Sequence, residues 1–155
     1  MSGSPMLPNP SVIVECLACF VGCTGFFIVY NIHGPGGFVC ALGGVVTWAV
    51  FCLAEHFGCD SLVCYFLSTL AAASYAETMA RIRKYPAISY LVISIFPLIP
   101  GAGVYYTTNH LINGDMASFA SKGKETIAIA GVIAVGILMI SSLVRLTGKW
   151  RLRKH

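Results

Sequence analysis

Residues 126–146, TIAIAGVIAVGILMISSLVRL, decide the fold class of this protein. An α-helix needs about 20 mostly apolar residues to cross the ~30 Å hydrocarbon core of a bilayer, and this stretch has that length and character. Within lipid, each backbone N–H and C=O group must be satisfied inside its own segment, so a helix is the expected state. The sequence therefore predicts a transmembrane helix here.

The rest of the 155-residue chain repeats this pattern. Four further apolar stretches of similar length lie at residues 12–30, 37–55, 62–80 and 87–106. Turns that are rich in helix breakers or in charge separate most of them. We therefore expect one integral membrane domain over residues 1–155, an all-α transmembrane helix bundle that ends in a basic tail at 148–155. The predicted bundle has about five spans, and a four-span arrangement is the alternative.

The composition excludes an ordinary soluble protein. Hydrophobic residues make up 57% of the chain and charged residues only 10%, whereas a soluble domain carries roughly 25% charged residues. No lysine or arginine precedes Arg81, so the net charge of +4 says little about nucleic acid, and we expect no nucleic-acid partner. The basic residues indicate instead which side of a membrane the loops face.

The basic residues cluster in segments that a five-span topology places on one side of the membrane. These residues are Arg81, Arg83, Lys84, Lys149, Arg151, Arg153 and Lys154. The loops on the other side carry Lys122 and Lys124. Because cytoplasmic loops carry an excess of lysine and arginine, we predict that the N-terminus lies outside and the C-terminus lies in the cytoplasm.

Seven cysteines lie mostly within the apolar stretches. Cys16 and Cys19 form a CxxC pair, but a redox or metal site needs thiolates, which apolar surroundings disfavour. We interpret the cysteines as small packing residues, and a membrane thiol redox protein that uses Cys16 and Cys19 is the less favoured alternative. The chain has no motif typical of a catalytic, metal or cofactor site, so we expect none of these.

The most informative segment is FPLIPGAGVYYTT at residues 96–108. Pro97 and Pro100 lack a backbone N–H, and each prevents the carbonyl four residues earlier from making its helical hydrogen bond. The carbonyls concerned belong to Ile93 and Phe96. At membrane depth, such a break is tolerated only where protein or water satisfies the freed groups. The sequence predicts that the fourth span is a broken helix.

A broken helix places a helix N-terminus within the membrane, and transporters use this arrangement to bind substrate carboxylates. A structural kink is the alternative. The two glycines and the polar residues that follow the prolines favour a substrate-binding site. The candidate residues are Pro97, Pro100, Gly101, Ala102, Gly103, Tyr105, Tyr106 and Thr107.

A second group of residues surrounds the basic turn at 81–86. Glu77 and Arg81 are four residues apart, so they can pair along one face of a helix. Pro86 ends the turn. Ionisable residues in membrane helices are candidates for function, and we expect a gating or ion-pair role for Glu77, Arg81 and Pro86. The alternative is an interfacial pair beside a turn that only fixes topology.

Together, the basic turn and the FPLIPG segment resemble the threonine/serine exporter family, and more narrowly its small-subunit branch. The resemblance runs from about Glu15 to the basic tail. Residues Pro97, Pro100, Gly101 and Tyr105 match the family's broken-helix motif, and residues Glu77, Arg81 and Pro86 match the turn before it.

The resemblance implies a subunit of a secondary transporter in the bacterial inner membrane that exports threonine and serine or a related small carboxylate. In the split branch, a small subunit works with a separate larger one, and a relative is linked to succinate export. The resemblance therefore implies a homo-oligomer, a larger exporter subunit, or both as partners, besides the substrate and the lipid bilayer. A non-transporting scaffold or assembly subunit remains the alternative.

Overall fold

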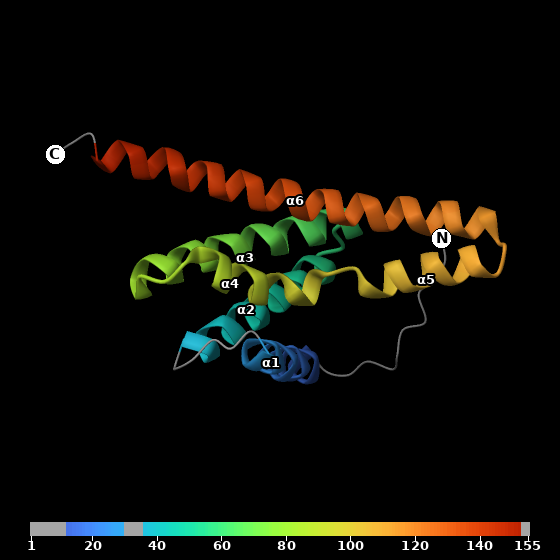
Figure 1. Cartoon of the computed structure of the whole chain (residues 1–155), viewed down its shortest axis with the longest axis horizontal. Coiled ribbons are helices and arrows are strands. Elements are labelled where there is room, and N and C mark those ends of the chain that lie inside the picture. The colour runs from blue at the N-terminus through green and yellow to red at the C-terminus, as the bar shows by residue number, and fades with distance from the viewer. Residues whose placement is uncertain (1–11, 30–35, 153–155) are drawn as a thin grey trace.

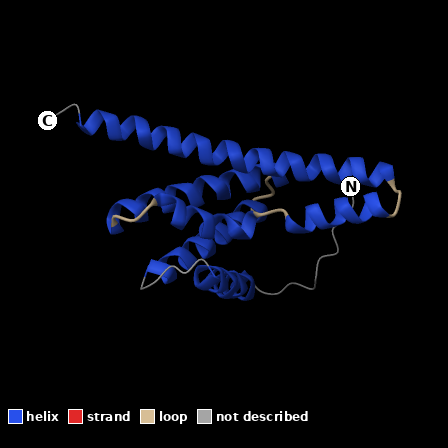
Figure 2. Cartoon of the chain, in the orientation of Figure 1, coloured by secondary structure: helices blue, strands red, loops and turns tan. Residues whose placement is uncertain are grey.

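A computed structural model describes residues 12–29 and 36–152, and this part of the chain is helical apart from short turns (Figure 2). In chain order the elements are α1 (Val12–Val29), α2 (Gly36–His56), α3 (Ser61–Arg83), α4 (Ala87–Ile95), the 3-10 helix η1 (Phe96–Leu98), α5 (Gly101–Ile112) and α6 (Met116–Leu152). The described part contains no strand, which confirms the all-α prediction. The turn at 30–35 and the tail residues Arg153 and Lys154 lie outside the described residues.

Helix α3 is the centre of the bundle, because α2, α4 and α6 all pack against it, whereas α1 packs mainly on the far side of α2 (Figure 1). Its buried side chains are small, which allows neighbouring helices to approach closely in lipid. They include Ser68, Thr69, Ala72, Ala73, Ala76 and Ala80. The buried hydroxyls of Ser68 and Thr69 donate to carbonyls one turn earlier in α3, so their polarity is satisfied within the helix.

The ends of α3 follow from the residues beside it. Asp60 caps the first turn, because its carboxylate accepts the N–H of Leu62 at 3.3 Å, and aspartate is among the preferred residues at this position. At the other end, Lys84 adopts the left-handed conformation (φ 57°), and its N–H bonds to the carbonyl of Ala80. This reversal forms the basic turn, after which α4 returns alongside α3.

Two adjacent glycines of α2 allow α1, α3 and α4 to meet on it. A Cβ atom on Gly43 would overlap Ser94 Oγ and lie 2.8 Å from the ring of Tyr75. A Cβ atom on Gly44 would overlap the Cys23 sulfur and lie 3.6 Å from Pro97. We call this contact between Gly43–Gly44 and the break in the fourth span the glycine seam.

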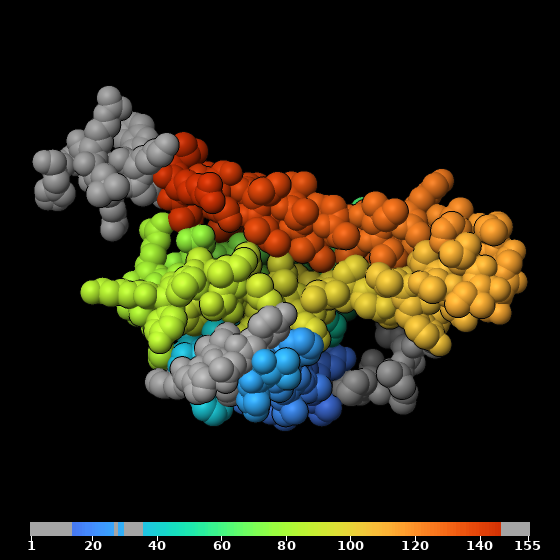
Figure 3. All heavy atoms as spheres, viewed as in Figure 1, coloured from blue at the N-terminus to red at the C-terminus, as the bar shows by residue number. Residues whose placement is uncertain are grey.

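The fourth span is broken, as predicted. Helix α4 and the η1 turn are followed by α5, and the two parts meet at a bend of 56°. Among the described elements, α5 packs only against α6, and the hairpin that they form extends past α1–α4 (Figures 1 and 3). The bundle and the hairpin are therefore joined by the break and by α6.

The residues between the fourth and fifth apolar stretches are helical apart from a short turn. Helix α5 continues to Ile112, and after a short turn α6 runs unbroken over 37 residues. Asp115 starts α6, since its carboxylate accepts the N–H of Ser118 at 3.1 Å; hydrogen bonds from Ser118 also lower the pKa of Asp115 below its usual value. At 1.5 Å per residue, α6 is about 55 Å long, well beyond the ~30 Å of a bilayer core.

The count of about five spans is approximate. Helix α2 and residues Met116–Leu146 of α6 are each long and apolar enough to cross a bilayer, and the bent pair of α4–η1 and α5 reaches that length together. The apolar part of α1, Val14–Phe26, is shorter than a span. Helix α3 has the length, with 23 residues, but its surface is rich in small and polar residues because other helices surround it.

The glycine seam predicts that Gly43→Ala destabilises the protein. The added methyl group has no room between Ser94 and Tyr75, and overpacking of this kind typically costs about 1–3 kcal/mol. We expect a lower midpoint of thermal unfolding in detergent micelles. Gly131→Ala is the matched control, since Gly131 is exposed and nothing lies within 4 Å of its added Cβ. Equal midpoints for the two variants would contradict the seam.

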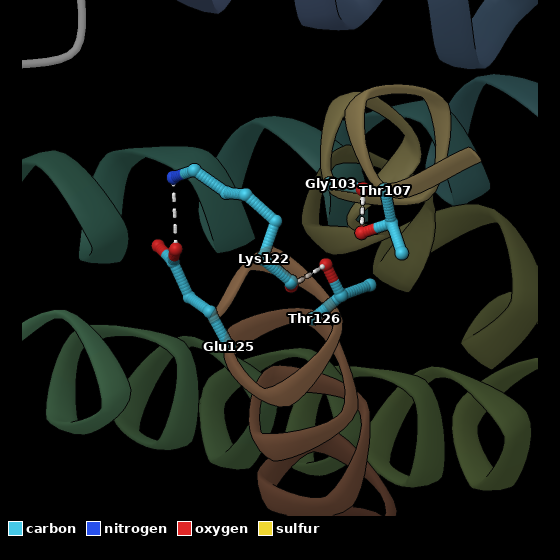
Figure 4. A network of polar contacts seen from close by, with 5 residues as sticks. All are labelled: Gly103, Thr107, Lys122, Glu125 and Thr126. Carbon is cyan, nitrogen blue, oxygen red and sulfur yellow. Dashed lines mark hydrogen bonds and ion pairs between the residues drawn. The ribbon is translucent and has the colours of Figure 1, made fainter. Parts of the chain in front are cut away.

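The hairpin predicts a second-site rescue. A Cβ atom on Gly103 of α5 would lie 2.6 Å from Thr126 Oγ1 of α6 (Figure 4), so Gly103→Ala should push the helices apart and speed amide hydrogen exchange in α5. Adding Thr126→Ala removes that oxygen and should restore slow exchange. Gly101→Ala, with nothing within 4 Å of its Cβ, should leave exchange unchanged. Fast exchange that persists in the double variant would argue against this contact.

Candidate functional site

Protein groups satisfy the carbonyls that the two prolines free. The carbonyl of Ile93 accepts the N–H of Phe96 and also the thiol of Cys23 from α1, at an S···O distance of 3.6 Å. The carbonyl of Phe96 accepts the N–H of Ile99 at 3.2 Å through the tight η1 turn. The α4 side of the break is thus held inside the bundle, which meets the requirement that membrane depth imposes.

The position of Pro97 along α4 places the break near the middle of the predicted span. Pro97 follows the start of α4 at Ala87 by 10 residues, which corresponds to about 15 Å at 1.5 Å per residue and to half of a ~30 Å core. Gly44, which faces Pro97, is eight residues from the start of α2. Both helices start at the same end of the molecule (Figure 1), so the position of Gly44 along α2 agrees with that of Pro97 along α4.

The other side of the break is open. Helix α5 begins at Gly101 after Pro100, and no side chain caps its first turn. Gly101 and Ala102 are exposed, and a Cβ atom on Gly101 would meet nothing within 4 Å. A helix N-terminus carries partial positive charge from its N–H groups, so this turn presents a weakly cationic surface beside the break.

The remaining residues of the predicted substrate site do not point into one pocket. Tyr105 and Tyr106 are 66% and 50% exposed, and their rings contact each other edge to face. Thr107 and Gly103 face α6. Within α5, Thr107 Oγ1 donates to the carbonyl of Gly103 at 2.7 Å (Figure 4). Only the prolines and the first turn of α5 therefore lie at the break itself.

Ser94 lies beside the break, although sequence reasoning did not single it out. Its side chain is fully buried against Gly43, and its Oγ has no hydrogen-bond partner among the described residues. A buried hydroxyl without a partner is uncommon because its desolvation is uncompensated. A serine within an apolar span does not by itself indicate a site. Ser94 stands out only once the structure shows that it is buried against Gly43 of α2.

Glu77 and Arg81 do not form the ion pair that their spacing allows. Among the side chains that the structure describes, ion pairs join His110 to Asp115 and Lys122 to Glu125, while Arg81 is exposed. Pro86 precedes α4 and ends the basic turn, and its carbonyl accepts the N–H of Ser89.

Glu77 instead lines a hollow of about 130 Å³ between α3, α4 and α6. The residues that line it are Ala73, Ala76, Glu77, Ala87, Ile88, Leu91 and Ser141. Five of these are small or aliphatic, so Glu77 and Ser141 supply the polar side chains of the hollow. We refer to it below as the Glu77 hollow.

The cysteines of α1 are free thiols. Cys16 and Cys19 are free and partly buried. Their neighbour Glu15 accepts hydrogen bonds from the indole of Trp48 at 3.1 Å and from the thiol of Cys52 at 3.5 Å. In the described ranges, no group of three or more His, Cys, Asp and Glu residues is placed to hold a metal ion.

Comparison with protein-family models identifies a family for this chain. The family model described as threonine/serine exporter matches residues 15–143, a range that includes the glycine seam, the break and the Glu77 hollow. No curated protein matches the chain, and no solved structure does. Because the match covers most of the 155 residues and includes the segments that shape the break, this chain belongs to the threonine/serine exporter family.

Proposed function

We propose that this chain is a subunit of a secondary transporter that exports threonine and serine, or a related small carboxylate, across the bacterial inner membrane. The family match over residues 15–143 carries this proposal, since members are exporters of this type. The break supports it, because the first turn of α5 is uncapped and open beside a kink near mid-membrane depth.

We propose that the carboxylate of the substrate binds at the first turn of α5. The N–H of Gly101 donates to the carbonyl of Ile99 at 2.7 Å, whereas the exposed Ala102 beside it leaves the backbone accessible, and helix N-termini favour anions. Pro97 and Pro100 hold the turn at this depth. In this proposal Tyr105, Tyr106 and Thr107 form the outer part of the path.

The proposed orientation places the N-terminus outside and the C-terminus in the cytoplasm. Arg81, Arg83 and Lys84 lie at the same end of the molecule as the end of α6, whereas Lys122 and Lys124 lie in the hairpin at the opposite end (Figure 1). An excess of basic residues marks the cytoplasmic side.

The proposed partners are further copies of the chain, a larger exporter subunit, or both. Only 11% of the membrane-crossing window of α6 is buried, so most of this helix is available to lipid or to another subunit. The described helices are also few for a transporter built from repeats around a central site.

Transport by the purified chain in proteoliposomes tests the function. We expect uptake of labelled serine and threonine. Gly101→Trp should lower it by at least about tenfold, equivalent to ~1.4 kcal/mol, because the indole fills the open turn. Gly101→Ala is the control, since the extra methyl group meets no neighbour.

Equal transport by wild type and Gly101→Trp would remove the proposed site. If the wild-type chain transports no serine, threonine or succinate, either alone or with a larger subunit, the chain is a scaffold or assembly subunit. Succinate transport without serine transport would replace the amino acid by a dicarboxylate as the substrate.

A further inference from the structure

We propose that the Glu77 hollow is a second substrate site, which binds the zwitterionic head group of an α-amino acid. This inference rests on the proposed export function and specifies its substrate class. It also adds a second binding site to the proposed substrate path, because the hollow is separate from the break.

The hollow has the size and the walls of a small-molecule site. Its volume of about 130 Å³ is well above the roughly 10–15 Å³ that one water molecule needs. Ala73 and Ala76 of α3 line it between α4 and α6, and these two outer helices do not pack against each other. The space is therefore left open by the fold, with alanines in place of larger side chains that would close it.

The charge of Glu77 decides what fits in this space. Glu77 lies six residues before the end of α3, about 9 Å from that end along the helix axis at 1.5 Å per residue. Its side chain is half-buried, a carboxylate is costly beside hydrocarbon, and Glu77 has no ion-pair partner within the described chain. A lipid tail in the hollow would leave this charge uncompensated, whereas an ammonium group would neutralise it.

Two arginines supply the opposite charge one helical turn away. Arg81 follows Glu77 by four residues in α3, and Arg145 follows Ser141 by four residues in α6. This spacing puts each arginine on the same helix face as the hollow residue, about 6 Å further along the axis. Both arginines are exposed and unpaired with any described acidic residue.

The order of charges matches an α-amino acid. An α-amino acid carries its ammonium and carboxylate groups on one carbon, so it can place the ammonium against Glu77 while the carboxylate points to Arg81 and Arg145. The Ser141 hydroxyl is positioned to contact the substrate's polar side chain. A dicarboxylate has no cationic group, and Glu77 would repel it. The hollow therefore favours amino acids over succinate.

The hollow and the break are successive sites. Leu91 lines the hollow, and Pro100 follows it by nine residues, which is roughly 13 Å at 1.5 Å per residue. One small amino acid cannot contact both. Because the hollow lies toward the basic end of the bundle, a substrate that leaves the cytoplasm would meet it first.

Binding to the purified full-length chain, measured by calorimetry, tests the inference with three probes. Serine carries both charged groups, ethanolamine only the ammonium, and 3-hydroxypropionate only the carboxylate. We expect Glu77→Gln to weaken serine and ethanolamine binding at least tenfold without weakening 3-hydroxypropionate. Arg145→Gln should weaken serine and 3-hydroxypropionate but not ethanolamine.

Matched controls separate the site from general charge effects. Glu55→Gln removes an exposed carboxylate at the other end of the bundle, and Arg83→Gln removes a basic residue from a different face of the same turn. Neither should change any of the three affinities. If Glu77→Gln does not fold, two other variants test the site. These are Arg145→Gln and Ser141→Ala, and the second should weaken serine binding.

Two results overturn the inference. One is wild-type affinity of Glu77→Gln for serine and ethanolamine in a protein that still transports serine, which would leave the export function standing. The other is the absence of ethanolamine binding to the wild-type chain. Failure of the proposed export function has a different signature, namely no transport of any labelled substrate by the wild type.

Discussion

The structure depends on one constraint, which is that a proline break at membrane depth must have its freed carbonyls satisfied by the protein. The Cys23 thiol of α1 and the η1 turn meet that need, and the thiol reaches the break because α2 offers glycines at the crossing point. Any larger side chain there would separate α1 or α4 from α2. Proline and glycine are thus required together, on helices that are far apart in sequence.

The break divides the molecule into a packed part and an open part. On the α4 side, Ser94 and Ile93 are fully buried among α1, α2 and α3. On the α5 side, the described helix has no buried residue and packs only on α6. A transporter needs a fixed frame and an element that can change its exposure, and we propose that the two parts take these roles. The Glu77 hollow lies on the α4 side of the break, toward the basic turn between α3 and α4.

The sequence predicted features that local chemistry determines, and it missed those that depend on distant neighbours. The break follows from two prolines, and the start of α3 follows from the apolar stretch that begins at residue 62. The group that satisfies Ile93 could not be predicted, because Cys23 lies 70 residues away. The apolar pattern starts the last span at residue 126 because residues 116–125 are polar, whereas α6 starts at Met116, directly after the Asp115 cap. The spacing of Glu77 and Arg81 allows an ion pair along α3. Instead, α4 and α6 do not pack against each other, and Glu77 lines the hollow that lies between them.

The central claim is that the first turn of α5 is a substrate site open to water within the membrane. The most direct measurement is labelling of Gly101→Cys, in a chain that keeps Cys23, by a membrane-impermeant thiol reagent in proteoliposomes, with the unsubstituted chain as the background. The cysteine fits, because nothing lies within 4 Å of a Cβ at this position. The account predicts that the reagent reacts and that serine slows the reaction. A cysteine that stays unlabelled, or that reacts equally fast with saturating serine while transport continues, would contradict it.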